Sequence, residues 1–541
     1  MKKIIYSVIA VLSALTFASC SLDEQSFTEM EKKNYMKNAA EAETVLLGVY
    51  ENLTEEHMYG WHLSLYFTLG TDQAVVSGGS TDSWRDVPCN YYSTSAAQVQ
   101  QTWAALYNAV YDANSFIERL SVAVEDYSPA DRQRAAVMMA EARALRAMFY
   151  FELVRWYGNI VLMTSTGQSQ KHPSTFVQSP ASEVYEFIEQ DLQYAIKTLP
   201  YASEDTYRSS NSYRFSKAAA IGLLTKVYCT WAGYPVCDET KWYKAVTTAK
   251  PLVESGQHGL LEDFEQLWKN ATKGVWNPVE SLIEVSFYAN VISGGDPVGR
   301  IGKWNGVPAP QRDKDYIRLN SYWQVVPTFI SQWKDYRQDK RWSLSFADFQ
   351  YDDNLNRKLI GKGFEVAMTG TDSDRKAFNG KLYPAKWDLI KYADEYLSDA
   401  NYSNTNWYIL RYSDVLLLYA EALNELNKAP TEDAYEAVNI VRRRAGLPNL
   451  SGLSYDSFRQ AVRDERSHEL CFEGHRKQDL IRWGIYYDSI IQTRDALNEW
   501  HEEANKNYLV GVYTEEGKHE LLPIPQRELD LMKECDQNPN W

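Results

Sequence analysis

The chain has 541 residues, of which 45% are hydrophobic, so it can bury a substantial core. Its length allows either two or more average domains or one large helical domain with insertions. The formal net charge of −16 argues against nucleic acid and anionic lipid surfaces as partners.

Residues 1–19 have the order of an export signal. Two lysines open the segment, an apolar run continues to Phe17, and two small residues precede Cys20. The run is shorter than the about 20 apolar residues that a transmembrane helix needs. We therefore predict a lipoprotein signal peptide, a lipid on Cys20 and a polar tether over residues 20–38. Ordinary signal cleavage beside a chance cysteine is the alternative.

The other five cysteines form no C-x-x-C motif. An odd number in an exported protein indicates at most sporadic disulfides, and Cys229 with Cys237 is the nearest pair in sequence. Neither a disulfide framework nor a zinc site is indicated. We predict no metal and no cofactor.

Residues 39–255 have the apolar periodicity of helices, interrupted by one polar segment. This first loop, residues 56–97, is rich in Gly, Ser and Asp and contains Trp84 and Arg85. Long loops of this kind often carry function. Residues 217–253 resemble a tetratricopeptide repeat. With the expected pairs 99–157, 38–55 with 182–199, and 411–446, the pattern predicts about four helix pairs.

Residues 256–406 form an insertion with short β-like runs and frequent Gly and Pro. Its aromatic residues lie off helical stripes; they include Trp276, Tyr288, Trp304, Tyr322 and Trp323. Such rings suit the CH face of a pyranose, and Asp296, Arg300, Asn305 and Gln324 could bond sugar hydroxyls. The alternative is that each ring fills the insertion's own core. Because residues 299–306 contain three glycines and no apolar partner at helical spacing, we predict that Trp304 is presented to solvent.

Residues 407–541 begin with a helix pair, for which Thr431 is the expected N-cap of the second helix. A third helix, 457–484, is predicted to carry Glu465, Glu469 and Glu473 on one face. Arg463, Arg466, Arg476 and Arg482 are the expected partners of these acids. We interpret the acids as a structural ion-pair clamp and not as a catalytic or metal site. His468-Glu469 begins like a zincin motif, but Phe472 replaces the second histidine.

The C-terminal part also carries a family resemblance. RYSDVLLLYAEALNE, VRRRAGL, VRDERSHELCFEGHRKQDLIRWG, LLPIPQREL and the final NPNW resemble the SusD/RagB family of outer-membrane nutrient-binding lipoproteins. The likeness extends to the signal segment and to the helical pattern. It implies a mainly α, tetratricopeptide-like fold with a large irregular, aromatic-rich insertion. It also implies a lipid-anchored protein at the cell surface that acts as a hinged lid on a SusC-like TonB-dependent transporter and delivers oligosaccharide to it.

In the family, ligand is held by the insertion and by the loop after the first helix. The resemblance points to Trp84 and the 300–323 segment, and with the aromatic and polar pattern of the insertion we expect these ligand-binding residues: Trp84, Arg85, Tyr288, Trp304, Asn305, Tyr322 and Trp323. Three alternatives remain open. A peptide ligand is possible in the RagB branch; a glycoside hydrolase would need two carboxylates about 5–9 Å apart; a pure tetratricopeptide scaffold would not need the insertion. We predict a binding protein, not an enzyme.

Overall fold

The computed structural model describes residues 36–82, 84–205, 214–288, 297–312, 318–378, 381–393, 399 and 401–541. Cys20 and Asp296, to which the sequence analysis gave roles, lie outside these residues. Within the described part, no helix combines the length and the apolar character needed to cross a membrane.

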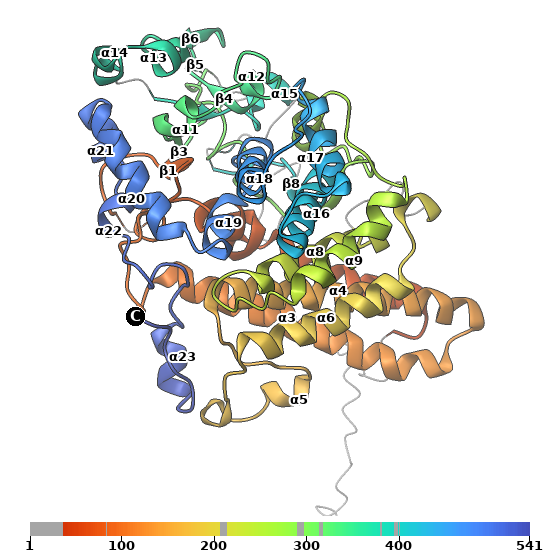
Figure 1. The fold of residues 1–541 in the computed structure, drawn as a ribbon. Helices are drawn as coiled ribbons and strands as arrows, with labels where there is room; N and C mark the ends of the chain where they lie inside the picture. The colour runs from red at the N-terminus through yellow and green to blue at the C-terminus, as the bar shows by residue number, and fades with distance from the viewer. Residues whose placement is uncertain are drawn as a thin grey trace, which may run out of the picture.

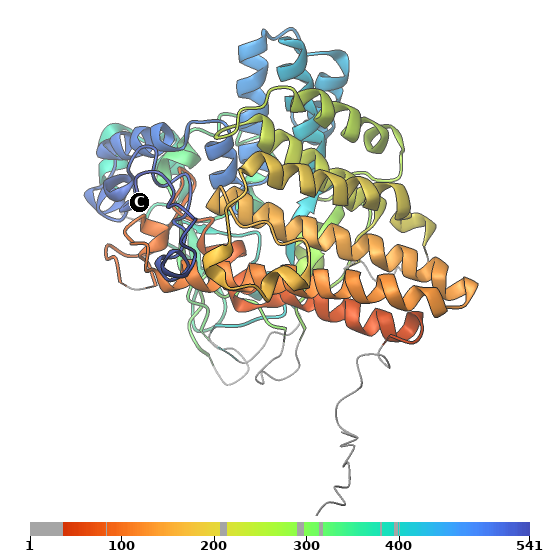
Figure 2. The same cartoon turned by 90° about the horizontal axis from the view of Figure 1, so that it is seen from below.

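Long helices dominate the molecule, as predicted. They are α2 (Ala39–Glu51), α3 (Ala97–Ala123), α4 (Pro129–Tyr157), α6 (Ala181–Thr198), α8 (Lys217–Ala232), α9 (Lys241–Glu254), α16 (Tyr412–Asn427), α17 (Glu432–Arg444) and α18 (Tyr455–Glu469). Successive helices pack side by side in a curved stack (Figures 1 and 2). The mainly α, tetratricopeptide-like expectation is confirmed.

One expected helix pair differs from the observed packing. Helix α2 packs on α3 and α4, whereas α6 packs on α4 and α8, so α4 lies between the two helices that were expected to pair. The helix ends follow sequence signals. The Asn38 side chain accepts hydrogen bonds from two amides at the start of α2, and Thr431 caps α17 as predicted.

Close packing of α8 depends on its small residues. A Cβ on Gly222 would lie 2.8 Å from a Leu410 side-chain atom and 2.9 Å from one of Val415. Because position 222 has no side chain, α8 can contact both α16 and the strand that precedes α16.

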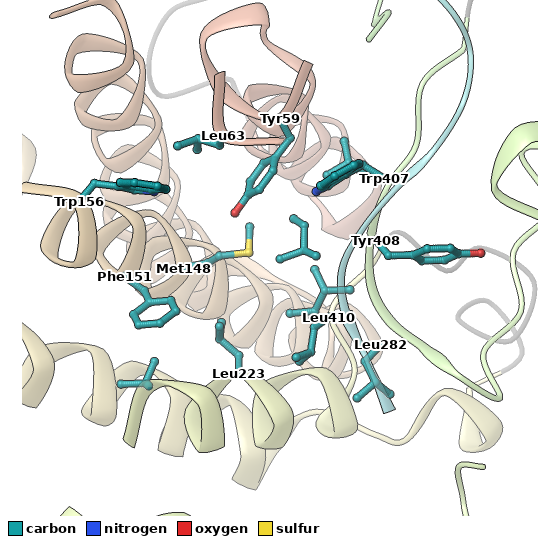
Figure 3. Close-up of a cluster of buried hydrophobic side chains, with 14 of the residues drawn as sticks. Tyr59, Leu63, Met148, Phe151, Trp156, Leu223, Leu282, Trp407, Tyr408 and Leu410 are labelled. Carbon is teal, nitrogen blue, oxygen red and sulfur yellow. The ribbon is translucent and has the colours of Figure 1, made fainter. Parts of the chain in front are cut away.

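Among the described residues, eight short strands form four antiparallel two-stranded sheets. They pair β1 (Ala74–Val76) with β3 (Trp323–Val325), β2 (Ser281–Val285) with β8 (Trp407–Arg411), β4 (Phe346–Ala347) with β7 (Tyr383–Pro384), and β5 (Phe349–Tyr351) with β6 (Arg357–Leu359). Strand β2 is one of the short β-like runs expected in the insertion. The β2–β8 pair lies against the helices, where Leu282 and Leu410 join a buried cluster with Met148 and Leu223 (Figure 3).

Short helices lie between α4 and α6, in the insertion and in the C-terminal region. These are α5 (Thr166–Ser169), α10 (Glu265–Lys273), α11 (Pro327–Ser331), α12 (Trp342–Ser345), α13 (Phe364–Thr369), α14 (Asp372–Ala377), α15 (Leu389–Tyr392), α19 (Arg476–Arg482), α20 (Tyr486–Ala496), α21 (Glu502–Lys506), α22 (Val510–Tyr513) and α23 (Gln526–Leu531). Part of the insertion has a small core of its own, which includes Val307, Tyr351 and Leu389.

The predicted third helix is in fact two helices, α18 and α19. Between them, Phe472 and Gly474 have φ angles of 63° and 82°, which end the right-handed helix. A Cβ on Gly474 would lie 3.1 Å from the Trp407 ring, so this glycine allows the turn to approach β8 closely. Glu473 therefore stands in the turn and not on the helix face.

The three acids form a buried ion-pair cluster, but with other partners than expected. Glu465 bonds Arg341 and Arg442; Glu469 bonds Arg341, Arg411 and Arg444; Glu473 bonds Lys386 and Arg411. The expected arginines have other roles. Arg466 pairs with Asp414 and Asp479, Arg476 with Asp72, and Arg482 with Glu421 and Asp479, while Arg463 lies over the Trp483 ring.

The cluster is a clamp between two parts of the chain. Arg341 and Lys386 come from the insertion, whereas Glu465, Glu469 and Glu473 come from the C-terminal region. Partners from the distant insertion leave no signal near the three acids in the sequence, whereas nearby arginines do. Cys229 and Cys237, the nearest pair of cysteines in sequence, form no disulfide, since both thiols are free.

Candidate ligand-binding site

The β1–β3 ribbon brings the first loop and the insertion together. Ser77 N donates to Tyr322 O at 2.7 Å, just beyond the paired strands. Arg85 Nε donates to Ser77 O at 2.8 Å, which ties the turn that carries Trp84 to the same ribbon. The first loop and the part of the insertion that contains Trp304 and Tyr322 thus meet at one edge.

Aromatic rings gather at this edge. The Trp84 ring centroid lies 4.8 Å from that of Tyr322 and 5.5 Å from that of Trp304, and the Trp304 and Tyr322 centroids are 4.3 Å apart. The Arg85 guanidinium carbon lies 3.7 Å from the centroid of the Trp84 ring. Trp84, Arg85 and Tyr322 are half-buried, so part of each remains open to solvent.

Trp304 is not presented to solvent, which corrects the sequence prediction. Its exposed fraction is only 8%, because Trp61 of the first loop covers it at a ring distance of 5.2 Å. Trp61 lies more than two hundred residues away in sequence, so residues 299–306 alone could not indicate that it covers Trp304. Arg300 completes the cover: its guanidinium lies 4.0 Å from the Trp61 centroid and 4.6 Å from that of Trp304, and it pairs with Glu56.

Asn305 and Trp323 are also buried. Asn305 Oδ1 accepts a hydrogen bond of 2.7 Å from Gly302 N, so this side chain holds the turn before it. Trp323 lies on the core side of β3 and its Nε1 donates to Leu65 O at 3.1 Å. The Asn305 hydrogen bond lies within the insertion, and the Trp323 hydrogen bond joins the insertion to the first loop. Tyr288, by contrast, is 64% exposed but does not line the cavity described next.

A cavity of about 920 Å³ opens beside the aromatic edge, and we call it the main cavity. Ser77, Tyr322 and Gln324 of the ribbon form one wall. The remaining wall is mostly polar and includes Gln311, Arg318, Asn320, Gln350, Asp352, Asp353, Lys358, Lys381 and Tyr383. Its size is typical of sites for small ligands. One half-exposed phenol, several amides and few apolar groups favour a hydroxyl-rich ligand over an apolar one.

Asp352 has its carboxylate held by its own turn. Its Oδ1 accepts hydrogen bonds of 2.9 Å from Asn356 N and from Asn354 N. These bonds, that from Asn356 most, hold the pKa of the Asp352 carboxyl below its ordinary value, so it is ionised at neutral pH. The ionised Asp352 carboxylate can accept hydrogen bonds from a ligand but carries no proton to donate.

The hydrogen-bonding side chains of the main cavity are mostly residues that the sequence analysis did not select. Gln350 and Lys358 belong to the β5–β6 hairpin, and Gln311, Arg318 and Asn320 to an irregular segment. The turn signal DDNLN at residues 352–356 could have located the hairpin. Nothing local indicates that the hairpin faces Tyr322.

Comparisons with known proteins agree with this architecture. The family model described as the SusD family matches residues 327–541, and one described as starch-binding associating with outer membrane matches residues 22–229. A crystal structure of a SusD homolog from Bacteroides thetaiotaomicron is 52% identical, with a TM-score of 0.89 over 95% of this chain and 99% of that one. The chain belongs to the SusD family.

More distant members share the length and the fold. The SusD-like protein P2 of Formosa agariphila is 26% identical over 98% of this chain and 97% of its own. A structure named as a laminarin-binding SusD-like protein is 24% identical, with a TM-score of 0.68 over 93% of this chain and all of that one. The predicted family resemblance is thus confirmed.

Proposed function

We propose that this SusD-family protein binds an oligosaccharide in the main cavity at the cell surface. The observation that carries the proposal is the half-buried Tyr322, which packs against Trp84 and lines the main cavity beside amide and charged side chains. Aromatic faces stack on the CH faces of sugar rings, and amides bond hydroxyls. Relatives that are named for binding laminarin or starch support a glycan as the ligand.

Binding without hydrolysis fits the acids of the main cavity. A glycosidase needs one carboxylic acid with a raised pKa to protonate the leaving group. Asp352 has the opposite property, because its turn amides lower its pKa. Its acidic neighbour in the cavity wall, Asp353, is adjacent in the chain and extends from the same turn, not from an opposite wall.

We further propose that the protein is anchored to the outer membrane by a lipid on Cys20 and delivers glycan to a SusC-like TonB-dependent transporter. The family membership supports this role. Copurification of such a transporter with the lipidated protein from its native membrane tests it. A protein isolated from those membranes without any TonB-dependent transporter would contradict it.

The binding proposal is tested by calorimetry on the protein from Ser21 onward with soluble starch, laminarin, xylan and homogalacturonan. We expect one of these to bind and Tyr322→Ala to weaken that affinity at least about tenfold, as for a truncated aromatic anchor. Tyr243→Ala is the matched control, since Tyr243 is a tyrosine on α9 that is 62% exposed and outside the cavity. The proposal fails if none of the four binds, or if Tyr322→Ala binds like wild type.

A further inference from the structure

The outer face of the β1–β3 ribbon continues beyond the main cavity. Val75 pairs with Gln324, and Val326 N donates to Gln73 O at 2.9 Å. Because side chains alternate along a strand, Tyr322, Gln324 and Val326 lie on one face of β3 and its extension. Trp323 lies on the other face, in the core. Tyr322 and Gln324 on this face are half-buried, whereas Val326 at its end is almost fully buried.

This face forms part of the wall of two cavities. Tyr322 and Gln324 line the main cavity, whereas Val75, Gln324 and Val326 line a second cavity of about 210 Å³. Gln324 and Lys381 belong to both walls, so the two cavities adjoin across these side chains. The shared residues indicate that the two cavities adjoin at the ribbon, and Val325, from the other face of β3, also lines the second cavity.

A third cavity follows in the same direction. It has a volume of about 700 Å³ and shares Leu497 and His501 with the second cavity. His501 caps α21, its Nδ1 accepting a hydrogen bond of 3.2 Å from Glu503 N. In Figure 1, α21 lies next to β1 and β3, as this order requires.

We propose that the three cavities form one extended groove, so that a glycan held in the main cavity continues along the ribbon to α21. This inference rests on the proposed function and makes its ligand a long chain. The second cavity offers an apolar surface from Val75 and Phe378, with Asn507 and His501 as hydrogen-bonding groups. That combination repeats the chemistry that a sugar chain needs.

The test is the length dependence of binding. The probes are size-fractionated oligosaccharides, from disaccharide to decasaccharide, prepared from whichever of the four polysaccharides binds. We expect affinity to rise about tenfold or more between the tetrasaccharide and the decasaccharide, equivalent to about 1.4 kcal/mol. Two variants change the second cavity. Asn507→Trp fills it with an indole, and His501→Ala removes an imidazole that lines both the second and the third cavity.

Both variants should bind the tetrasaccharide like wild type and lose the gain shown by the decasaccharide. Asn427→Trp is the matched control, because it adds an indole at the exposed end of α16, outside all three cavities. Equal affinities for short and long chains in wild type, or full long-chain affinity in both variants, would overturn the groove and leave the proposed function standing. Failure to bind any length would remove the proposed function as well.

Discussion

Replacing Glu469 by Gln should destabilise the protein without changing its affinity for glycan. Glu469 is fully buried, and its carboxylate accepts hydrogen bonds of 3.0 Å from Arg411 and 3.0 Å from Arg341 and a shorter one from Arg444. Glutamine has nearly the same shape but removes the negative charge.

The size of the effect follows from the charge balance of the cluster. Its five basic residues are Arg341, Lys386, Arg411, Arg442 and Arg444, and its five acidic residues are Glu280, Asp339, Glu465, Glu469 and Glu473. Glu469→Gln leaves one uncompensated buried positive charge. Breaking a buried pair costs about 3–5 kcal/mol. Because each of the three guanidiniums keeps another carboxylate, we expect the lower end, about 3 kcal/mol.

The effect should also depend on pH. Burial alone would raise the pKa of Glu469, but Arg444, Arg411 and Arg341 hold it well below its ordinary value of 4.5. A lowered pKa in the folded state gives stability that is complete above pH 4.5 and is lost as the pH falls further. The difference between wild type and Glu469→Gln should therefore shrink below pH 4.5.

Urea unfolding at pH 7 and at pH 3.5 measures both effects. Glu436→Gln is the control, because Glu436 also pairs with an arginine, Arg443, but its side chain is 60% exposed. An exposed pair contributes at most about 1 kcal/mol. The reasoning is refuted if Glu469→Gln unfolds at the same urea concentration as the Glu436→Gln control, or if it folds normally but no longer binds glycan.

Three further predictions concern burial, pH and the anchor. Trp304→Ala should lower the free energy of unfolding by about 3–5 kcal/mol, since the ring is 8% exposed; a wild-type urea transition would show that the ring is dispensable. Burial raises the pKa of Glu284 from 4.5 to about 7. The contribution of Glu284 to the stability of the folded protein is therefore highest below pH 4.5 and is lost as the pH rises through 7. Glu284→Gln should therefore stabilise the protein by about 3 kcal/mol at pH 8 and little at pH 4.5, measured by thermal melting at both pH values. Cys20→Ala should release the protein from the membrane fraction in cells that lack the transporter, and unchanged association would contradict lipidation.

Local patterns predicted the helices well because a helix is a local structure. The Thr431 cap and the apolar stripe of α16 both lie within one or two turns of the residues that they organise. The existence of an ion-pair clamp was predicted for the same reason, since three acids spaced four residues apart need basic partners. Its partners were not, because Arg341 and Lys386 reach Glu469 and Glu473 from more than eighty residues away.

The site depends on contacts that no local pattern records. Strand β1 has three residues and pairs with β3 about 250 positions later. A strand so short cannot show alternation in the sequence, yet the register decides which aromatic residue faces the main cavity. The register that places Tyr322 on the outer face places Trp323 in the core, and a shift by one residue would exchange them.

Trp304 was predicted to face solvent and is instead buried behind Tyr322. The indole supports Tyr322 from behind, since Tyr322 N donates to Trp304 O at 2.6 Å and the two ring centroids are 4.3 Å apart. Trp304 in turn rests on Trp61 and Arg300 of two different segments. Removing Trp304 would thus weaken binding only by loosening Tyr322, and the loss should accompany a loss of stability. Removing Tyr322, whose half-buried ring lines the main cavity, should weaken binding more than it lowers stability, so the two variants separate the cavity-lining residue from the one that positions it.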